Sequence, residues 1–164
     1  IALKEKIQKN STGEKHKIKL HYITSRGNWY HISWKGDVSK SGGIATNIGV
    51  HFFDMLMWIF GDVKENIVHN HTAETAAGKL VLENAEVDWL LSIDADNLPE
   101  EVKQSGKRTF RSLMIDGESF EFSEGFTELH NISYEQILNG KGFPLSETRK
   151  AIQLVHDIRN AGLK

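Results

Sequence analysis

The stretch SGGIATNIGVHFFDMLMWIFGDV, which runs from Ser41 to Val63, decides how this chain folds. Between Ile44 and Phe60 it contains no proline and is mostly apolar, and Gly61 is the residue type that commonly ends a helix. Because apolar side chains would lie nearly all round, we predict a buried central helix. Its longest mostly apolar part falls short of the roughly 20 residues needed to span a bilayer, so we expect no membrane span.

Four larger polar or amphipathic side chains of this helix share one face. At 100° per residue, Asn47, His51, Asp54 and Trp58 fall within about 60° of one another. An imidazole titrates near neutrality, so His51 is a candidate general acid/base, which Asn47 could position and with which Asp54 could share a hydrogen bond. Alternatively, these residues are only hydrogen-bonded core groups that close a helix end, and the spacing alone does not choose between the two interpretations.

Alternating patterns predict strands on both sides of the helix. From Lys15 to Thr24, apolar residues alternate with Lys and His, as in a half-buried strand, and the pair Asp116-Gly117 is a strong hairpin signal. We predict strands over residues 15–24, 66–71, 79–83, 86–94, 108–115 and 118–122, and further helices over 3–9, 127–138 and 146–161. These elements predict an α+β fold, with a mostly antiparallel open sheet and helices packed on one face.

The connection from Arg26 to Gly43 is predicted to be a loop that carries large rings and cations. Its aromatic residues are Trp29, Tyr30 and Trp34, which lie among Arg26, Lys35 and Lys40. Such a loop either contacts a ligand or anchors its rings in the core.

The composition excludes several classes of function. The chain has 164 residues, 39% of them hydrophobic, which predicts one domain with a real core. Its net charge of −2 gives no basic field for nucleic acid, so we expect no nucleic-acid partner. With no Cys there is no disulfide and no thiolate chemistry, which fits a reducing, cytoplasmic compartment. The chain opens at Ile1 without an initiator Met, which indicates a piece of a longer protein.

Two short motifs permit ligand binding without requiring it. Ser41-Gly42-Gly43 could present backbone N–H groups to an anion, or serve only as a tight turn into the helix. His69 and His71 have a metal-compatible spacing, but further ligands are not apparent, and we expect no metal site. The sequence contains no G-x-G-x-x-G and no G-x-x-x-x-G-K-[ST] motif, so we expect no cofactor-binding residues in this chain.

The Ser41–Val63 stretch resembles the glycine-rich loop and helix in the C-terminal domain of the glucose–fructose oxidoreductase, inositol dehydrogenase and MocA family. That helix commonly reads G-G-x-x-x-D-x-G-x-H-x-x-D, and this chain has Asn47 where Asp is usual. Together with YITSRGNWYHISWKGD, SEGFTELH and SYEQIL, the Asn resembles one subgroup, the UDP-N-acetylglucosaminuronate 3-dehydrogenases of bacterial surface-polysaccharide (lipopolysaccharide, O-antigen) biosynthesis.

The resemblance implies a dihydrodipicolinate-reductase-like C-terminal fold for residues 1–164, which would form the substrate-binding and oligomerisation domain. NAD would be bound mainly by an N-terminal Rossmann domain that these residues do not contain, so the chain alone is expected to be inactive. By resemblance, His51 with Asn47 would be catalytic, and His51 would take the C3 hydroxyl proton of the UDP-sugar. Residues expected to contact that substrate are Arg26, Asn28, Trp29, Tyr30, Lys35, Thr46 and Asn47.

The roles implied for the loop are an anion clamp made by Arg26 and Lys35, and stacking of Trp29, Tyr30 and Trp34 on uracil or sugar. The family also implies 2-oxoglutarate as the compound that regenerates NAD, and a homodimer or homotetramer formed through the open sheet face. Two alternatives remain: a non-enzymatic α+β binding or dimerisation module, and a family member acting on another sugar or polyol.

Overall fold

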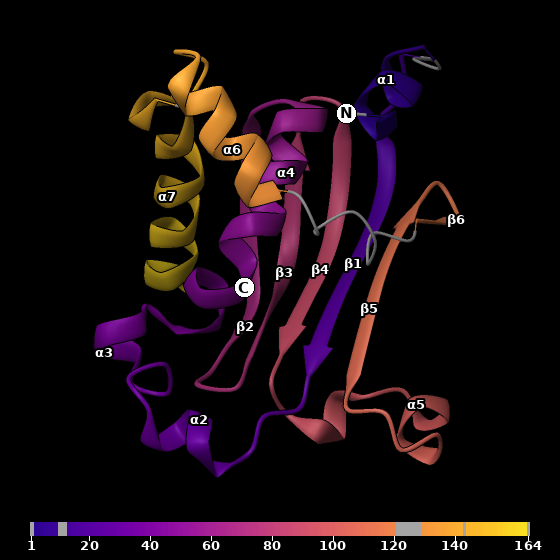
Figure 1. Ribbon diagram of the computed structural model, residues 1–164. Coiled ribbons are helices and arrows are strands. Elements are labelled where there is room, and N and C mark those ends of the chain that lie inside the picture. The colour runs from indigo at the N-terminus through magenta and orange to yellow at the C-terminus, as the bar shows by residue number, and fades with distance from the viewer. Residues whose placement is uncertain (1, 10–12, 121–128, 143, 164) are drawn as a thin grey trace.

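The computed structural model describes residues 2–9, 13–120, 129–142 and 144–163 (Figure 1). In chain order, the elements are α1 (Ala2–Lys9), β1 (His16–Thr24), α2 (Asn28–Ile32), α3 (Val38–Ser41), the π-helical turn η1 (Ala45–Gly49), α4 (Val50–Phe60), β2 (Val63–His71), β3 (Thr75–Leu82), β4 (Ala85–Ser92), the 3₁₀ turn η2 (Ala95–Asn97), α5 (Glu100–Gln104), β5 (Thr109–Ile115), β6 (Glu118–Phe120), α6 (Leu129–Leu138) and α7 (Leu145–Asn160).

The described strands form one open sheet in the order β2-β3-β4-β1-β5-β6. All neighbours are antiparallel except β1 and β4, which run parallel. The predicted α+β class and the mostly antiparallel sheet are therefore confirmed. Because β1 lies next to β5, Tyr22 pairs in register with Arg111, a residue 89 positions later in the chain.

The turn predicted at Asp116-Gly117 is confirmed. Both residues have positive φ, 52° and 85°, as a tight two-residue hairpin between β5 and β6 requires. The predicted strand end at Phe122 and helix start at Thr127 lie outside the described residues.

Strand β3 begins at Thr75, four residues before the predicted start at Lys79. Its first half consists of small residues, which give no apolar alternation. Packing against the neighbouring strand β4 explains the glycine among these small residues. A Cβ on Gly78 would lie 2.9 Å from Cζ2 of Trp89, so a residue without a side chain is needed where this ring crosses the strand.

Helices α4 and α7 cover one face of the sheet (Figure 1). The buried side chains of α4 are Phe53, Leu56 and Phe60, and the Phe53 ring lies 5.3 Å from the ring of Trp89 on β4. Within the described part of the chain, the run Val38–Phe60 is long and apolar enough to cross a membrane by length and composition. Here its buried residues pack on the sheet, as in the core helix of a globular domain.

Two local predictions need correction. The segment Arg26–Gly43, predicted as a loop, contains the short helices α2 and α3, and Asp37 caps α3 by accepting a hydrogen bond from the Ser39 backbone N–H at 3.0 Å. The segment Ile44–Phe60, predicted as one α-helix, begins with the π-helical turn η1 before α4. Neither feature has a strong sequence signal, because single-turn elements lack the repeated spacing on which such predictions depend.

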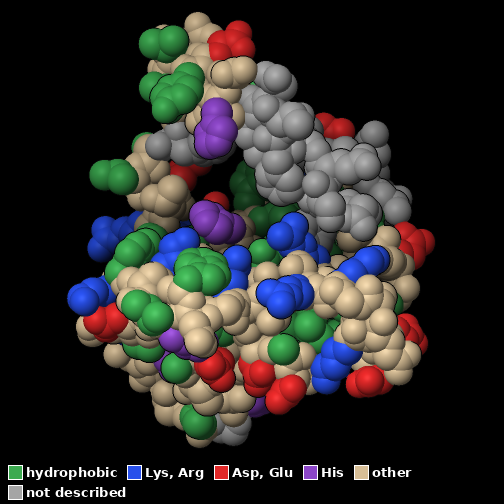
Figure 2. All heavy atoms as spheres, turned by 60° about the horizontal axis from the view of Figure 1, so that its bottom comes forward, with side chains coloured by type: hydrophobic (Ala, Val, Ile, Leu, Met, Phe, Trp, Pro, Cys, Tyr) green, Lys and Arg blue, Asp and Glu red, His purple; other side chains and the backbone are tan. Residues whose placement is uncertain are grey.

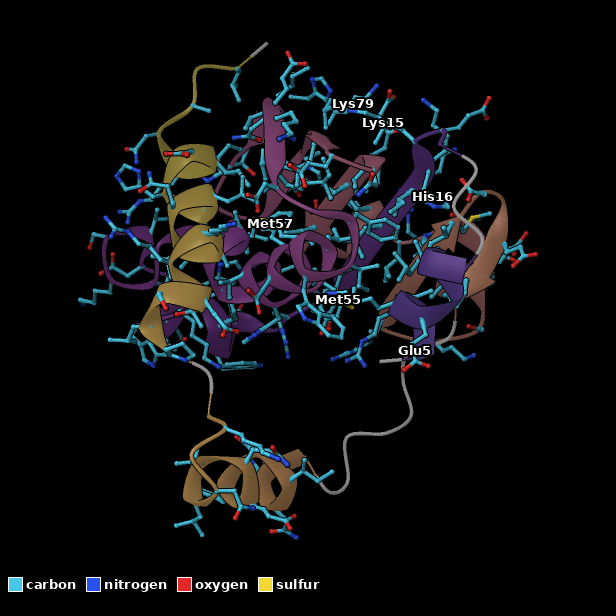
Figure 3. The ribbon with its side chains drawn as sticks, turned by 90° about the horizontal axis from the view of Figure 1, so that it is seen from above. Glu5, Lys15, His16, Met55, Met57 and Lys79 are labelled. Carbon is cyan, nitrogen blue, oxygen red and sulfur yellow. The ribbon has the colours of Figure 1, made fainter. Side chains whose placement is uncertain are left out.

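The opposite face of the sheet carries charged side chains. Glu86 on β4 accepts hydrogen bonds from Lys17 on β1 at 2.8 Å and forms an ion pair with Lys79 on β3 at 2.9 Å. These two ammonium groups lower the pKa of Glu86 from 4.5 to about 2. Figure 3 shows Lys79 on the side of the molecule opposite to Met55 of α4.

Candidate active site

A cavity of about 430 Å³ opens between α4, its preceding π-turn and the strands β1 and β5. It brings together residues from three separate stretches of the chain. Its lining consists of Tyr22, Arg26, Asn47, Ile48, His51, Phe52, Met55 and Arg111. Three of the predicted site residues, Arg26, Asn47 and His51, thus lie in one cavity.

The π-turn η1 places Asn47 and His51 on the cavity. Gly49 lies between them and is buried against the sheet, where an added Cβ would be 2.8 Å from Cδ1 of Leu91 and 2.6 Å from the Phe53 ring. The helix can approach β4 this closely only with a glycine at that position. Single π-turns within helices occur frequently at functional sites, and this one carries Asn47 and leads directly into the first turn of α4, which carries His51.

The four side chains predicted to share one helix face have different surroundings in the structure. Asn47 and His51 line the cavity, whereas Asp54 is exposed and outside it, and Trp58 packs instead with the ammonium of Lys4, 4.3 Å from its ring centre. Among the described residues, no hydrogen bond joins Asp54 to His51. The predicted pairing of this carboxylate with the imidazole is therefore not present.

Arg111 is the charged cavity residue that the sequence analysis missed. Its guanidinium lies 5.1 Å from the centre of the Tyr22 ring, and its Nη2 donates a hydrogen bond to Tyr22 Oη at 3.3 Å. One signal was available: alternation in β5 puts Arg111 on the same face as Leu113 and Ile115, which are buried in the core. A charged residue on the strand face whose other side chains are buried indicates a polar cavity rather than open solvent.

The two arginines bring unneutralised positive charge to the cavity. Arg26 follows β1 and lies 5.8 Å from the ring centre of Trp29, and Arg111 contacts a neutral hydroxyl. Neither guanidinium forms an ion pair with a carboxylate in the part of the chain that the structure describes. Figure 2 shows Lys and Arg side chains gathered beside a hollow on this side of the molecule.

The rings of the aromatic loop differ in their environment. Tyr30 is only 4% exposed and belongs to the core, so its ring does not present a free face for stacking on a ligand, contrary to the prediction. Burial raises the pKa of Tyr30, while the Asn47 side chain and the charge of Arg26 act in the opposite direction. Trp29 and Trp34 are exposed.

The remaining predicted contacts, Lys35, Thr46 and Asn28, do not line the cavity. The Lys35 carbonyl accepts a hydrogen bond from Asn47 Nδ2 at 3.5 Å, so the backbone at Lys35 supports the Asn47 amide. The Thr46 hydroxyl donates to the Gly42 carbonyl at 3.0 Å and stabilises the start of the helix. Asn28 begins α2 and is exposed.

Gly42 and Gly43 turn the chain from α3 into η1. This supports the prediction of a tight turn into the helix over that of an anion site. Both have positive φ, 76° and 80°, and a Cβ on Gly42 would lie 2.7 Å from Thr46 Oγ1. Conformation and space therefore explain both glycines. No group of three His, Cys, Asp or Glu side chains in the described residues could hold a metal ion, and His71 Nε2 is buried without a hydrogen-bond partner.

Residues 4–95 match the family described as "Oxidoreductase family, C-terminal alpha/beta domain". This chain belongs to that family. The chain is also 48% identical to the WlbA (WbpB) dehydrogenase from Thermus thermophilus, solved in complex with NAD and alpha-ketoglutarate, with a TM-score of 0.92. A second structure of that enzyme, in complex with NAD and UDP-GlcNAcA, gives 47% identity and a TM-score of 0.91. Each match covers 99% of this chain and 52% of the other, so the chain spans about half the length of these relatives.

A more distant similarity shows the fold alone. The WlbA dehydrogenase from Bordetella pertussis, in complex with NADH and UDP-GlcNAcA, is 18% identical and has a TM-score of 0.69, over 96% of this chain and 55% of that one. The family resemblance inferred from Ser41–Val63 and the predicted fold are thus confirmed.

Proposed function

We propose that this chain is the substrate-binding half of an NAD-dependent oxidoreductase that oxidises the C3 hydroxyl of UDP-N-acetylglucosaminuronate in bacterial surface-polysaccharide synthesis. One observation carries the proposal: His51 and Asn47 share a cavity with two arginines that form no ion pair with any described carboxylate, in a chain 47% identical to a dehydrogenase solved with NAD and UDP-GlcNAcA.

Oxidation of a secondary alcohol removes a proton from oxygen and a hydride from carbon. His51 takes the hydroxyl proton on a ring nitrogen, because imidazole is basic enough near neutral pH and can return the proton in the reverse direction. The amide of Asn47 does not titrate, so it can hold and orient the hydroxyl without competing for its proton. Because Asn47 stands where the family usually has Asp, it does not compete with His51, which remains the base that takes the hydroxyl proton.

NAD, when bound, supplies the hydride acceptor for this reaction. The cavity offers an acid/base, an amide and two cations, and the sequence contains no glycine-rich dinucleotide motif. The residues present thus fit contact with the substrate and with the reacting end of the cofactor, while a second half of the complete polypeptide holds the rest of it. We expect the 164 residues alone not to oxidise the sugar.

Arg26 and Arg111 are suited to the acidic groups of the substrate. UDP-N-acetylglucosaminuronate carries a carboxylate and a diphosphate, and a guanidinium can bind either with two parallel hydrogen bonds. Arg111 projects from the rigid sheet beside the His51 cavity, which favours it for the uronate carboxylate. Arg26 lies next to the exposed Trp29, which favours that pair for the diphosphate and uracil.

Recognition of acidic groups by the two arginines also fits 2-oxoglutarate as the compound that regenerates NAD. The Thermus relative was solved with NAD and alpha-ketoglutarate, a dicarboxylate of the kind that two arginines bind. His51 would return the proton to the keto oxygen as hydride arrives at its carbon. We also propose a cytoplasmic homodimer or homotetramer, formed through the sheet face that carries Lys17, Lys79 and Glu86.

The test is turnover of the complete enzyme carrying His51→Ala. We expect kcat to fall by about 10² or more, because general acid–base catalysis contributes that much. The matched control is His156→Ala, which removes an exposed imidazole on α7 outside the cavity and should leave kcat unchanged. Turnover within twofold of the wild-type value in the His51 variant would overturn the proposed role.

A further inference from the structure

The hydroxyl group of Tyr30 is buried and makes no hydrogen bond with the described residues. Tyr30 is only 4% exposed, and its Oη is one of the buried polar atoms that have no partner in the described part of the chain. Such an atom lowers the stability of a fold, because it loses its bonds to water and gains none. Phenylalanine would fill the same space without that loss, so the hydroxyl needs an explanation outside the packing of the core.

Asn47, which lines the His51 cavity, is the polar side chain that acts most on this hydroxyl. Burial raises the pKa of Tyr30, and among the groups that oppose the rise, the Asn47 side chain has a larger effect than the charge of Arg26. Tyr30 itself does not line the cavity. Any effect of its hydroxyl on a bound substrate must therefore pass through a neighbour, and Asn47 is a neighbour that lines the cavity.

Among the described residues, one long hydrogen bond holds the Asn47 amide. Its Nδ2 donates to the Lys35 carbonyl over 3.5 Å, which is at the long limit for such a bond. A carbonyl oxygen can only accept, so this contact determines which end of the amide is the N–H end. Nδ2 carries two hydrogens, and the Lys35 carbonyl uses one of them. The second hydrogen is available to another oxygen on the same side.

One short segment supplies both oxygens on that side. The Ser33 hydroxyl donates to the Tyr30 carbonyl at 2.8 Å and accepts from the Lys35 backbone N–H at 3.3 Å. The turn is tight, because a Cβ on Gly36 would lie 2.7 Å from the Tyr30 carbonyl oxygen. The backbone at Lys35 is therefore tied to the helix that carries Tyr30, and both residues act on Asn47.

We propose that Tyr30 is a positioning residue for Asn47. Its hydroxyl oxygen accepts the second N–H of the amide, which fixes Nδ2 on the side of α2 and leaves Oδ1 to accept a hydrogen bond from the substrate next to His51. An amide that turned freely would offer both ends in turn and would orient the substrate less well. A fold that keeps such a hydroxyl sacrifices stability, as functional sites commonly do. The inference rests on the proposed function where it refers to the substrate.

Steady-state kinetics of the complete polypeptide with the UDP-sugar and NAD test this role. We expect Tyr30→Phe to lower kcat about 10-fold and to change KM less than about twofold, because the substrate still binds while its reacting group is misplaced. In an Asn47→Ala background the same substitution should have no further effect, because the amide on which the hydroxyl acts is absent. Tyr134→Phe, which removes an exposed hydroxyl on α6, is the matched control and should leave kcat unchanged.

Three results would overturn the positioning role. The first is a kcat of Tyr30→Phe within about twofold of the wild-type value, and the second is an equal loss with and without the Asn47 side chain, which would show a purely structural effect. The third concerns stability: the thermal midpoint of Tyr30→Phe should equal or exceed that of the wild type, because an unpartnered polar atom is removed. A lower midpoint would show that the hydroxyl is bonded within the fold.

A spectroscopic measurement separates this inference from the proposed reaction. In the isotope-labelled 164-residue chain, the nuclear magnetic resonance signals of the Asn47 side-chain N–H pair are identified by their loss in Asn47→Ala. Tyr30→Phe should shift this pair and speed its exchange with water, and Tyr134→Phe should do neither. If the pair responds but the complete protein does not oxidise the UDP-sugar, the proposed function fails and the positioning role stands. If turnover depends on His51 and the pair is unchanged, the inference fails and the proposed function stands.

Discussion

Gly49→Ala tests whether helix α4 depends on a close approach to the sheet. The backbone of Gly49 has φ −70° and ψ −32°, which any residue adopts, so the substitution causes no backbone strain. The added Cβ would lie 2.6 Å from Cε2 of Phe53 and 2.8 Å from Cδ1 of Leu91. Both side chains are fully buried, so neither can move into solvent to make room.

Two opposing effects set the magnitude of this change. Alanine is favoured over glycine inside a helix by about 1 kcal/mol. Inserting a methyl group into a packed core costs about 1 to 3 kcal/mol. Because both contacts fall well below an ordinary van der Waals distance, we take the upper part of that range and expect a net loss of about 1 to 2 kcal/mol in the free energy of unfolding.

Urea unfolding of the 164-residue chain measures this loss. With an m-value of about 1 to 3 kcal/mol/M that the substitution does not change, a loss of about 1 kcal/mol lowers the midpoint by about 0.3 to 1 M. The control is the same substitution in a Phe53→Leu background, where the smaller side chain leaves space and Gly49→Ala should cost less. A Gly49→Ala chain as stable as the wild type would refute the close approach.

Two further predictions concern charge. Arg111→Gln in the complete protein should lower kcat/KM for the proposed uronate substrate by about 10-fold or more, because a hydrogen bond to a charged group contributes about 1.5 to 3 kcal/mol. Tyr22→Phe, which removes only the hydroxyl to which Arg111 donates, should change kcat/KM far less. An equal effect of the two variants would contradict direct recognition by Arg111. Glu86→Gln should lower the thermal midpoint at pH 7, since the folded-state pKa of Glu86 is depressed from 4.5 to about 2 by Lys17 and Lys79. That stabilisation is present above pH 4.5 and is lost as the pH falls toward 2, so melting curves of the two proteins should converge over that interval, and a constant difference would contradict this assignment.

Several features of this protein follow from the sequence alone. The apolar run Ile44–Phe60 predicts the core helix, and Asp116-Gly117 predicts the β5–β6 hairpin, because both signals depend on neighbouring residues only. The spacing of Asn47 and His51 is also local, and it places both on one helix face, whereas only the structure shows that this face lines a cavity. The family resemblance of Ser41–Val63 depends on the same short stretch.

The tertiary structure decided the rest of the site. Arg111 joins His51 because β5 pairs with β1, an arrangement set by long-range contacts that no local pattern records. Tyr30 enters the core while its neighbour Trp29 stays exposed, although both are large rings in one short segment. Residue type and spacing thus determine which side chains can carry chemistry, and only the packing of distant segments determines which of them meet in one cavity.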